Sequence, residues 1–421
     1  RFHWPISLRA YGGATALAAP LAPSLLKARA RRGKEDPARL SERLGRASAA
    51  RPKGPLVWLH AASVGESVSL LPLLEALKAG RPDLAFLVTS GTRTSAEIMA
   101  RRLPEGAIHQ YAPVDTPGAA ARFIDHWRPD AGLFVESELW PNLIAAARRA
   151  GTRLALVSAR ITEKSARGWR AQPGAAGAML RSFEVVLAQD EATERRIAAL
   201  GGTVNGRLNL KRVGKPLSCD EAELKRLADA VGARQVILAA STHEGEEALV
   251  AEAVAALEPR PLLVLVPRHP NRGAEIVRAL APAAVAVRSA GDPITDKTDV
   301  YLADTLGELG LFVRLAKVVV MGGGWAPGVG GHNPLEPARL GVGVVTGPDI
   351  ANHADAYGEM VQAGAAIVAT DVAALKAMLA DLLADQGRTD RLDRAARDFA
   401  EGQGDQFADA LGLVRPLLPP P

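Results

Sequence analysis

The 421-residue sequence contains a single cysteine, Cys219, so no disulfide can form within the chain. This cysteine usage is typical of a protein from a reducing compartment. A metal site built on cysteine is excluded. The eight histidines also lack the short, regular spacing of paired zinc ligands. We therefore expect a protein that carries neither a metal ion nor a cofactor.

Aromatic residues are also scarce, at 4% of the chain, and they do not alternate with basic residues. No nucleic-acid-binding motif is present, so the net charge of +5 does not indicate a nucleic-acid partner. The hydrophobic content of 48% is typical of a soluble globular protein. A chain of this length is too long for one ordinary core and suggests two domains.

Long hydrophobic runs are missing, apart from one uncharged stretch near the N-terminus. This stretch, "AYGGATALAAPLAPSLL" (residues 10–26), is interrupted by two glycines and two prolines and is barely long enough to span a bilayer. A basic cluster, Lys27 to Lys34, follows it, which is the wrong order for a cleaved signal peptide. We interpret residues 1–35 as a segment that lies on a membrane surface, with a cytoplasmic polybasic flank. The alternative is an ordinary N-terminal packing helix.

Beyond this segment, strand-like runs alternate with helical ones. Short apolar runs that end in small polar residues predict strands at "PLVWLHA", "LAFLVTSG", "AGLFVES" and "RLALVSAR". Helical patterns lie between them, for example "PNLIAAARRAG", which Gly151 closes as a C-cap. This alternation is typical of an α/β fold with a doubly wound parallel sheet.

The alternation pauses between Val204 and Leu224 and then restarts with a second set of strands. That set is "VILAAST", "LLVLVPRH", "AAVAVRS", "KVVVMGGG", "VGVVTGP" and "AAIVAT". We predict two Rossmann-like domains, residues 36–212 and 213–421, facing one another across a cleft, the GT-B arrangement of sugar-nucleotide transferases. The Pro-rich end, "VRPLLPPP", predicts a frayed tail.

Acidic residues follow two of the predicted strands in the first half. In "SVGESVSLLPLLEAL", Ser63 and Glu66 have the spacing of a capping box at a helix start. The same turn lies at the carboxyl end of a strand, where open α/β sheets place their active sites. Glu66 is therefore either a helix cap or a catalytic carboxylate. Glu136 and Glu138 of "ESELWPN" pose a similar choice between a solvated loop and carboxylates buried in a cleft.

A glycine-rich stretch in the second half, "MGGGWAPGVGGHNPLEPARLG", leads from a buried strand into a helix. Asn333 suits the N-cap, Pro334 the first helical position, and Glu336 the third. The stretch is either a well-capped helix start or a loop whose backbone amides bind phosphate. In the second case Glu336 would bind ribose hydroxyls, because a carboxylate would repel the phosphate.

Two more loops follow strands of the second half. "ASTHEGEE" places Ser241 and Glu244 at capping-box spacing, which favours a helix cap. "VPRHPNR" places Arg268, His269 and Arg272 on one loop, and guanidinium groups bind phosphate through two hydrogen bonds. We expect these loops to meet at one sheet edge and to form a phosphate-binding region.

Several of these stretches resemble, in family order, the 3-deoxy-D-manno-octulosonic acid (Kdo) transferases of lipopolysaccharide synthesis. The resemblance covers most of the chain, from about Leu44 to Asp355. The stretches that carry it are "WLHAASVGES", "TSGTRTSAEIMARRLP", "YAPVDTPGAAARFIDHWRPDAGLFVESELWPNL", "SAR", "STHEGEE", "PRHPNR", "DTLGELG" and "GGHNPLEPA". It implies a metal-independent, inverting transfer of Kdo from CMP-Kdo to a hydroxyl of the lipid A precursor. It also implies a place on the cytoplasmic face of the cell inner membrane.

The resemblance also implies roles for particular residues. Glu66 matches the general base, Glu136 a second acidic residue that supports the transition state, and Lys211 a lysine that stabilises developing charge. The implied CMP contacts come from three stretches: Arg268 and His269; Gly307, Glu308 and Leu309; and Asn333, Pro334, Leu335 and Glu336.

Two departures from the family pattern concern the first half. Ser158 stands where the family has asparagine, and "GRLNLK" is two residues longer than the usual Gly-Asn-Leu-Lys, which affects the assignment of Lys211. Two other functions compete with Kdo transfer. One is another GT-B sugar-nucleotide enzyme, such as an epimerase. The other is a non-catalytic nucleotide-binding module on a membrane surface.

Overall fold

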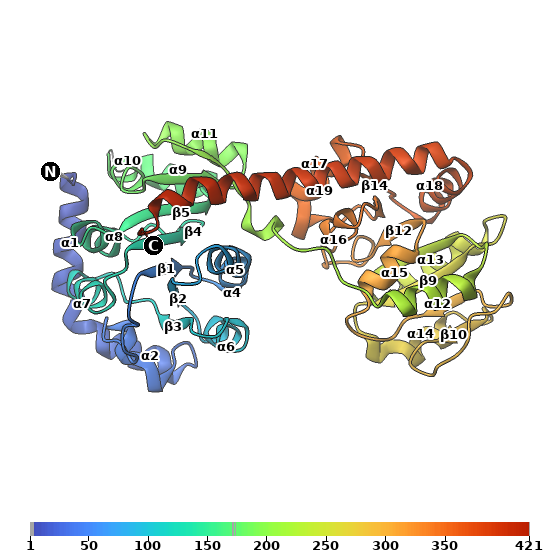
Figure 1. The fold of residues 1–421 in the computed structure, drawn as a ribbon, viewed down its shortest axis with the longest axis horizontal. Helices are drawn as coiled ribbons and strands as arrows, with labels where there is room; N and C mark the ends of the chain where they lie inside the picture. The colour runs from blue at the N-terminus through green and yellow to red at the C-terminus, as the bar shows by residue number, and fades with distance from the viewer. Residues whose placement is uncertain (1–3, 171, 173, 421) are drawn as a thin grey trace. The chain divides into compact units, whose positions relative to one another are not determined.

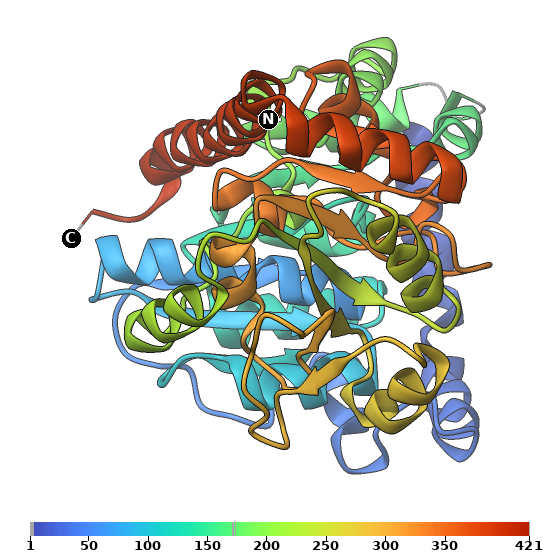
Figure 2. The same ribbon diagram turned by 90° about the vertical axis from the view of Figure 1, so that its right-hand side faces the viewer.

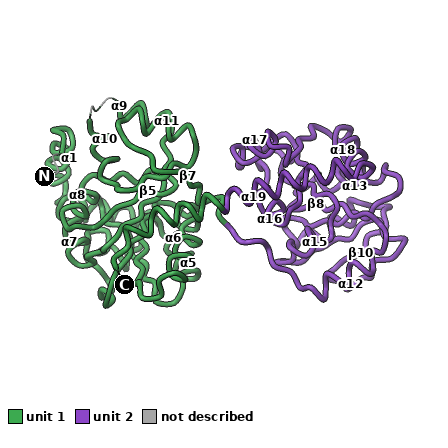
Figure 3. The backbone as a smooth tube through the Cα atoms, turned by 45° about the horizontal axis from the view of Figure 1, so that its top comes forward, with its two compact units in different colours: residues 1–213, 405–421 green, residues 214–404 purple. Residues whose placement is uncertain are grey.

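The computed structural model describes residues 4–170, 172 and 174–420 of the chain. The chain forms two compact units, each built on a parallel seven-stranded sheet (Figures 1 and 3). The first unit runs to Val213 and is completed by the chain from Asp405 onward. The second unit is Gly214–Gly404.

The sheet of the first unit has the strand order β3-β2-β1-β4-β5-β6-β7. Its strands are β1 (Leu56–His60), β2 (Ala85–Ser90), β3 (Ile108–Tyr111), β4 (Ala131–Val135), β5 (Arg153–Ala159), β6 (Val185–Ala188) and β7 (Gly206–Arg207). Every residue of the central strands β1 and β4 is buried. This explains their nearly continuous apolar sequences, because helices cover both faces of a parallel sheet.

Helices pack on both faces of this sheet. One core cluster contains Trp58 and Trp127 and packs α1 (Ile6–Ala18), α7 (Pro117–Trp127), α8 (Pro141–Arg149), α9 (Glu163–Arg170), α10 (Ala175–Leu180) and α11 (Glu191–Ala199). The other contains Leu59 and packs α4 (Val64–Ser69), α5 (Leu71–Gly80) and α6 (Arg93–Arg102). Thus the first unit has three layers, as expected for a doubly wound fold.

The end of the chain also belongs to this second cluster. Leu411, Val414, Leu417 and Leu418 are all buried in it, although the strand pattern of the sequence predicts that residues 405–421 belong to the second domain. The tail is also ordered as far as Leu418, so the expectation of fraying is wrong for these residues. The apolar side chains of this segment have a core to enter, and their burial outweighs the tendency of a Pro-rich terminus to fray.

The N-terminal helices α1 and α2 (Ala22–Arg31) lie on the first unit, with α3 (Leu40–Arg43) after them. Leu8 is buried, and the Tyr11 hydroxyl donates a hydrogen bond of 3.0 Å to Asp115. These contacts belong to a packing helix. None of the helices among the described residues combines the length and the apolar character needed to cross a bilayer.

The sheet of the second unit has the order β10-β11-β9-β8-β12-β13-β14, with helices on either side of it (Figure 2). Its strands are β8 (Val236–Thr242), β9 (Leu262–Pro267), β10 (Val285–Val287), β11 (Val300–Leu302), β12 (Val318–Met321), β13 (Val344–Thr346) and β14 (Ala366–Val368). Its helices are α12 (Glu221–Val231), α13 (Glu246–Ala255), α14 (Gly273–Ala279), α15 (Leu309–Leu315), α16 (Leu335–Arg339), α17 (Ala354–Gln362) and α18 (Val372–Ala384), with the start of α19 (Gln386–Val414). All paired strands run parallel, so the loops after the strands share one edge of the sheet.

Candidate active site

Glu66 lies in the first turn of α4, which follows β1 at the carboxyl edge of the first sheet. Ser63 caps α4, since its hydroxyl accepts a hydrogen bond of 3.3 Å from the Glu66 amide. The Glu66 carboxylate accepts from the Ala62 amide at 2.9 Å, one residue before the amide that a standard capping box uses. Glu66 is only partly buried, and a carboxylate can accept about four hydrogen bonds. The capping contact therefore leaves capacity for a substrate hydroxyl.

Glu136 follows β4, which is the neighbour of β1 in the sheet. Its backbone is left-handed, with a φ of 55°, and its side chain is buried. The Lys211 ammonium lies 2.5 Å from Glu136 Oε1. The structure thus brings together two residues that the sequence places in separate stretches.

Lys211 is held near Glu136 by the loop that follows β7. The Asn209 side chain accepts a hydrogen bond from the Lys211 amide at 3.1 Å, at the start of a 3₁₀ turn, Leu210–Arg212. Ser158, at the end of β5, accepts one from the Leu210 amide at 3.1 Å. Ser158, which departs from the family pattern, therefore stabilises the loop that carries Lys211 through this hydrogen bond.

Glu138, two residues after Glu136, ends a chain of buried hydrogen bonds that runs through the sheet. Trp58 donates to the Thr89 hydroxyl at 2.8 Å, and this hydroxyl lies 2.8 Å from His60 Nδ1. His60 Nε2 lies 3.0 Å from Glu138, and Trp140 donates to the same carboxylate at 2.6 Å. Burial raises the pKa of Glu138, but its hydrogen bond and electrostatic interaction with His60, together with the hydrogen bond from Trp140, outweigh burial and hold the pKa below its usual value. An ionised Glu138 only accepts, so His60 Nε2 carries the hydrogen of this contact.

A cavity of about 230 Å³ opens at this edge of the first sheet. Its walls come from the loops after β1, β2, β3 and β4. They include His60, Ala62, Asp115, Glu138 and Trp140. Because the Ala62 amide is bonded to Glu66, this cavity lies beside the candidate base. The sequence gives no signal for the role of His60, since its hydrogen-bond partners, Thr89 and Glu138, come from two other stretches.

In the second unit, Arg268 and His269 follow β9 and are both exposed. The His269 ring is in edge-to-face contact with His243, which follows β8, at a centroid distance of 5.9 Å. His243 is also stacked on His332, with their Nε2 atoms 2.8 Å apart. Burial, together with the neighbouring His243 and Arg268, lowers the pKa of His332 to about 4. The neutral pair shares one hydrogen between the two nitrogens.

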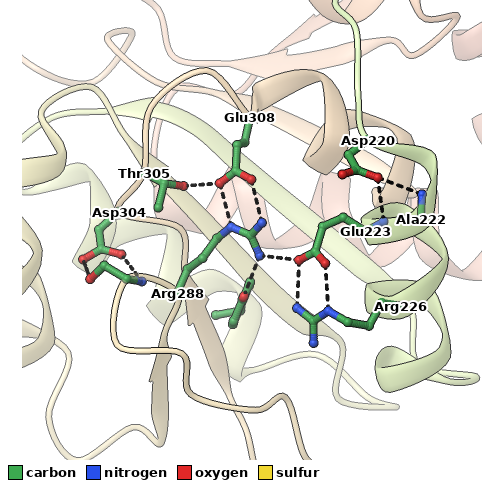
Figure 4. Close-up of polar contacts among 10 residues, drawn as sticks. Asp220, Ala222, Glu223, Arg226, Arg288, Asp304, Thr305 and Glu308 are labelled. Atoms are coloured by element: carbon green, nitrogen blue, oxygen red, sulfur yellow. Dashed lines mark hydrogen bonds and ion pairs between the residues drawn. The ribbon is translucent and has the colours of Figure 1, made fainter.

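The three residues Gly307, Glu308 and Leu309 form the turn into α15. The Glu308 carboxylate is engaged within the protein, because Arg288 donates two hydrogen bonds to it at 2.7 and 2.6 Å (Figure 4). Thr305 donates a third at 2.5 Å. The pKa of Glu308 is lowered, chiefly by the hydrogen bonds from Arg288. A nucleotide contact from this turn is therefore more readily made by backbone groups than by the Glu308 side chain.

Asn333, Pro334, Leu335 and Glu336 surround the start of α16. The helix begins at Leu335, one position later than predicted, and Glu336 is its second residue instead of its third. Asn333 still satisfies the helix start, because its side chain accepts from the Leu335 amide at 3.0 Å. Burial raises the pKa of Glu336, while the charges of Arg339 and Arg268 oppose this rise. Arg268 and Glu336, from different strands, therefore influence one another electrostatically.

The loop predicted to cap α13 is built differently from the expectation. The helix begins at Glu246, its N-cap is Gly245 without a side-chain hydrogen bond, and Ser241 has a φ of 57°. The capping-box prediction for Ser241 and Glu244 is therefore wrong. Glu246, which no sequence pattern singled out, instead accepts backbone hydrogen bonds from the glycine-rich loop after β12.

Two Rossmann-like units in one chain, with polar side chains on the loops after their strands, are typical of the GT-B fold. A similar fold is found in the MurG structure from Acinetobacter baumannii, at a TM-score of 0.55 and 14% identity, covering 85% of this chain and 100% of that one. Residues 38–212 match the family model described as 3-deoxy-D-manno-octulosonic-acid transferase (kdotransferase).

Two curated relatives define the family of the whole chain. The 3-deoxy-D-manno-octulosonic acid transferase of Bordetella pertussis is 39% identical over 378 residues, covering 84% of this chain and 86% of the relative. That of Rickettsia bellii is 35% identical over 341 residues, covering 80% and 81%. The chain belongs to the 3-deoxy-D-manno-octulosonic acid transferase family.

Proposed function

We propose that this protein transfers Kdo from CMP-Kdo to a hydroxyl of the lipid A precursor in lipopolysaccharide synthesis. The observation that carries the proposal is the arrangement at the first sheet edge. There Glu66 and Glu136 follow adjacent strands, and Lys211 is paired with Glu136. Family membership suggests the reaction. The carboxyl edge of the first sheet offers Glu66 as a base and Lys211 as a positioned positive charge.

In the proposed reaction Glu66 acts as the general base. The acceptor oxygen attacks the anomeric carbon of Kdo while its proton passes to Glu66. The bond from that carbon to the CMP phosphate breaks, and its electron pair leaves with CMP. A direct displacement of this kind inverts the anomeric centre. A positioned base contributes about 10²–10⁴-fold to such a step.

The second unit supplies the proposed donor contacts. Arg268 carries a positive charge at the end of β9 and suits the phosphate of CMP. Glu336 suits the ribose hydroxyls, since a partly buried carboxyl group binds hydroxyls whether or not it is ionised. Lys211, held by Glu136, is positioned to stabilise negative charge that develops during transfer.

One assay separates this function from its competitors. Release of CMP from CMP-Kdo is measured with and without a lipid A precursor, and the products are counted by mass spectrometry. Kdo transfer requires release that depends on the acceptor and a product heavier by Kdo. A nucleotide-binding module would bind CMP without turnover. An epimerase would act without any acceptor.

We further propose that the N-terminal segment associates with the cytoplasmic face of the inner membrane. Ile6, Leu17, Leu21 and Leu25 are 63–85% exposed. The basic residues between Lys27 and Lys34 follow them directly. Apolar side chains beside a basic cluster favour binding to anionic lipid.

Point substitutions test this association better than deletion of the segment, because Leu8 and Leu26 are buried in the fold. We expect the double variant L17E/L21E to fold normally but to sediment less with anionic vesicles. Glu244→Lys, an exposed change in the second unit, is the control. Equal sedimentation of the double variant and the wild type would exclude a membrane role for these leucines.

A further inference from the structure

The glycine-rich loop after β12 directs its backbone amides at a buried carboxylate. Glu246 Oε1 accepts hydrogen bonds from Trp325 at 2.9 Å and from Ala326 at 3.2 Å. Glu246 Oε2 accepts from Gly323 at 2.8 Å and from His243 at 2.9 Å. Four amide donors match the acceptor capacity of one ionised carboxylate.

Glu246 is only 2% exposed, so its charge is stabilised by these amides and not by water. A buried carboxylate that lacked such partners would be strongly destabilising. Hydrogen bonds from backbone amides to an ionised oxygen are among the stronger ones in proteins. The amides of Gly323, Trp325 and Ala326 are therefore already bonded to a carboxylate, and this geometry does not favour the prediction that they bind the nucleotide phosphate.

The shape of the loop leaves little freedom to rearrange around another anion. A Cβ atom at Gly322 would lie 2.6 Å from the carbonyl oxygen of Ser241, and one at Gly324 would lie 2.5 Å from the amide of Gly347. Gly323 has a φ of 82°. The loop is therefore fixed between the ends of β8 and β13, with Glu246 bonded to its amides.

The same loop leads directly to the proposed donor contacts. It continues through His332, which pairs with His243, to Asn333 and Glu336. Glu246 therefore joins the loop after β8 to the loop after β12, and we expect it to stabilise the conformation of both loops. Its backbone partners in the described residues belong to no other loops.

We propose that Glu246 is a positioning residue of the donor site. Its carboxylate is a built-in anion that holds the glycine-rich loop in the nucleotide-binding conformation before the nucleotide arrives. The donor phosphate consequently binds on the side of Arg268 and not on the amides of Gly323, Trp325 and Ala326. This inference rests on the proposed function for the identity of the nucleotide. An ordered site binds more tightly because the ligand does not have to order the loop.

Amide hydrogen exchange of the wild-type protein tests where the phosphate binds. We expect the amides of Gly323, Trp325 and Ala326 to be protected in the free protein and to change little when CMP is added. Weak protection that rises strongly with CMP would overturn the proposal, because the amides would then bind the nucleotide. This measurement needs no transfer activity, so its result is independent of whether the protein transfers Kdo.

Substitution tests the positioning role. Glu246→Gln places an amide NH₂ against backbone donors, so we expect CMP affinity by calorimetry and the KM for CMP-Kdo to worsen at least tenfold. The kcat at saturating donor and the KM for the acceptor should stay within about threefold. Glu244→Gln, an exposed change on the same loop, is the matched control and should resemble wild type.

The conservative variant Glu246→Asp keeps the charge, and we expect it to recover part of the lost affinity. Folded Glu246→Gln protein with wild-type CMP affinity would overturn the proposal. Loss of kcat alone would also overturn it, since that would place Glu246 in the chemical step. If Glu246→Gln does not fold, the aspartate variant and the exchange experiment decide the question.

Discussion

The carboxylates at the two sheet edges have different hydrogen-bond and ion-pair partners, and these partners indicate different roles. Glu246 and Glu308 are fully engaged with backbone amides or with arginine. Glu136 is buried against Lys211. Glu66 is partly exposed and makes a single capping contact through its side chain among the described residues. A proton acceptor needs capacity for a substrate, and Glu66 retains it.

At Glu66 a helix cap and a general base make different demands on the side chain. Glutamine can still accept from the Ala62 amide but cannot take a proton from a sugar hydroxyl. We expect Glu66→Gln to melt within about 2 °C of wild type yet to lose transfer about a hundredfold or more. Initial rates of CMP release and thermal unfolding measure the two effects.

Two further variants separate the cap from the base. Glu66→Ala should also lose the cap, at a cost of about 1 kcal/mol. Glu97→Gln, an exposed change on α6, should leave both rate and stability unchanged. Near-full turnover by Glu66→Gln would show that Glu66 is only a helix cap. The base would then be Glu136 or Glu138.

Among the elements, α19 is the one whose role depends most on distant parts of the chain. The helix starts among residues of the second unit and ends in the core of the first, where Val414 is buried. The 3₁₀ turn after it, Arg415–Leu417, keeps Leu417 in the same core. Residues 411–418 thus complete the sheet-covering layer that α4 and α5 begin.

This placement predicts that a substitution near the end of the chain weakens the first unit. Leu417 is 3% exposed, and Leu417→Ala should lower the free energy of unfolding of that unit by about 2–5 kcal/mol. Hydrogen exchange of the β1 amides, Leu56–His60, measures this loss. Leu413→Ala is the matched control, because Leu413 is 37% exposed and its truncation should lower the free energy of unfolding by less. Equal effects of the two variants would contradict the packing seen here.

On the scale of the whole molecule, each unit contains a histidine that is held neutral. Burial and the charge of Arg39 lower the pKa of His109 in the first unit to about 3. His332 of the second unit has a pKa of about 4, and it faces His243, Arg268, Glu246 and His353. Both units therefore resist protonation at positions that an unfolded chain would protonate near pH 6.5.

The sign of the resulting pH dependence follows from proton binding. Between pH 6.5 and the folded pKa values, the unfolded chain binds more protons, so stability falls as the pH falls through this range. For His109 the loss between pH 7.5 and pH 5 amounts to about 2 kcal/mol. Thermal unfolding at the two pH values measures it. His109→Asn should reduce the loss in the first unit only, and an unchanged loss would contradict the assignment.

Much of the fold follows from local sequence patterns. The ten predicted strands all occur, because a buried parallel strand needs a continuous apolar run and a small polar residue to end it. Four short strands, β3, β6, β7 and β11, were not predicted. The sequence also places Glu66, Glu136, Arg268 and Glu336 after strands, where the structure has them.

Only the tertiary structure decided which of these groups meet. Lys211 forms an ion pair with Glu136, and Glu246 accepts hydrogen bonds from the amides of a loop far along the chain. Residues after Asp405 pack in the core of the first unit. Local sequence cannot specify such pairings, because sheet order and loop path decide which groups come within bonding distance. For the same reason, the sequence of the glycine-rich loop allowed either a helix start or a phosphate site, and only the structure shows that its amides are bonded to a side chain of the protein itself.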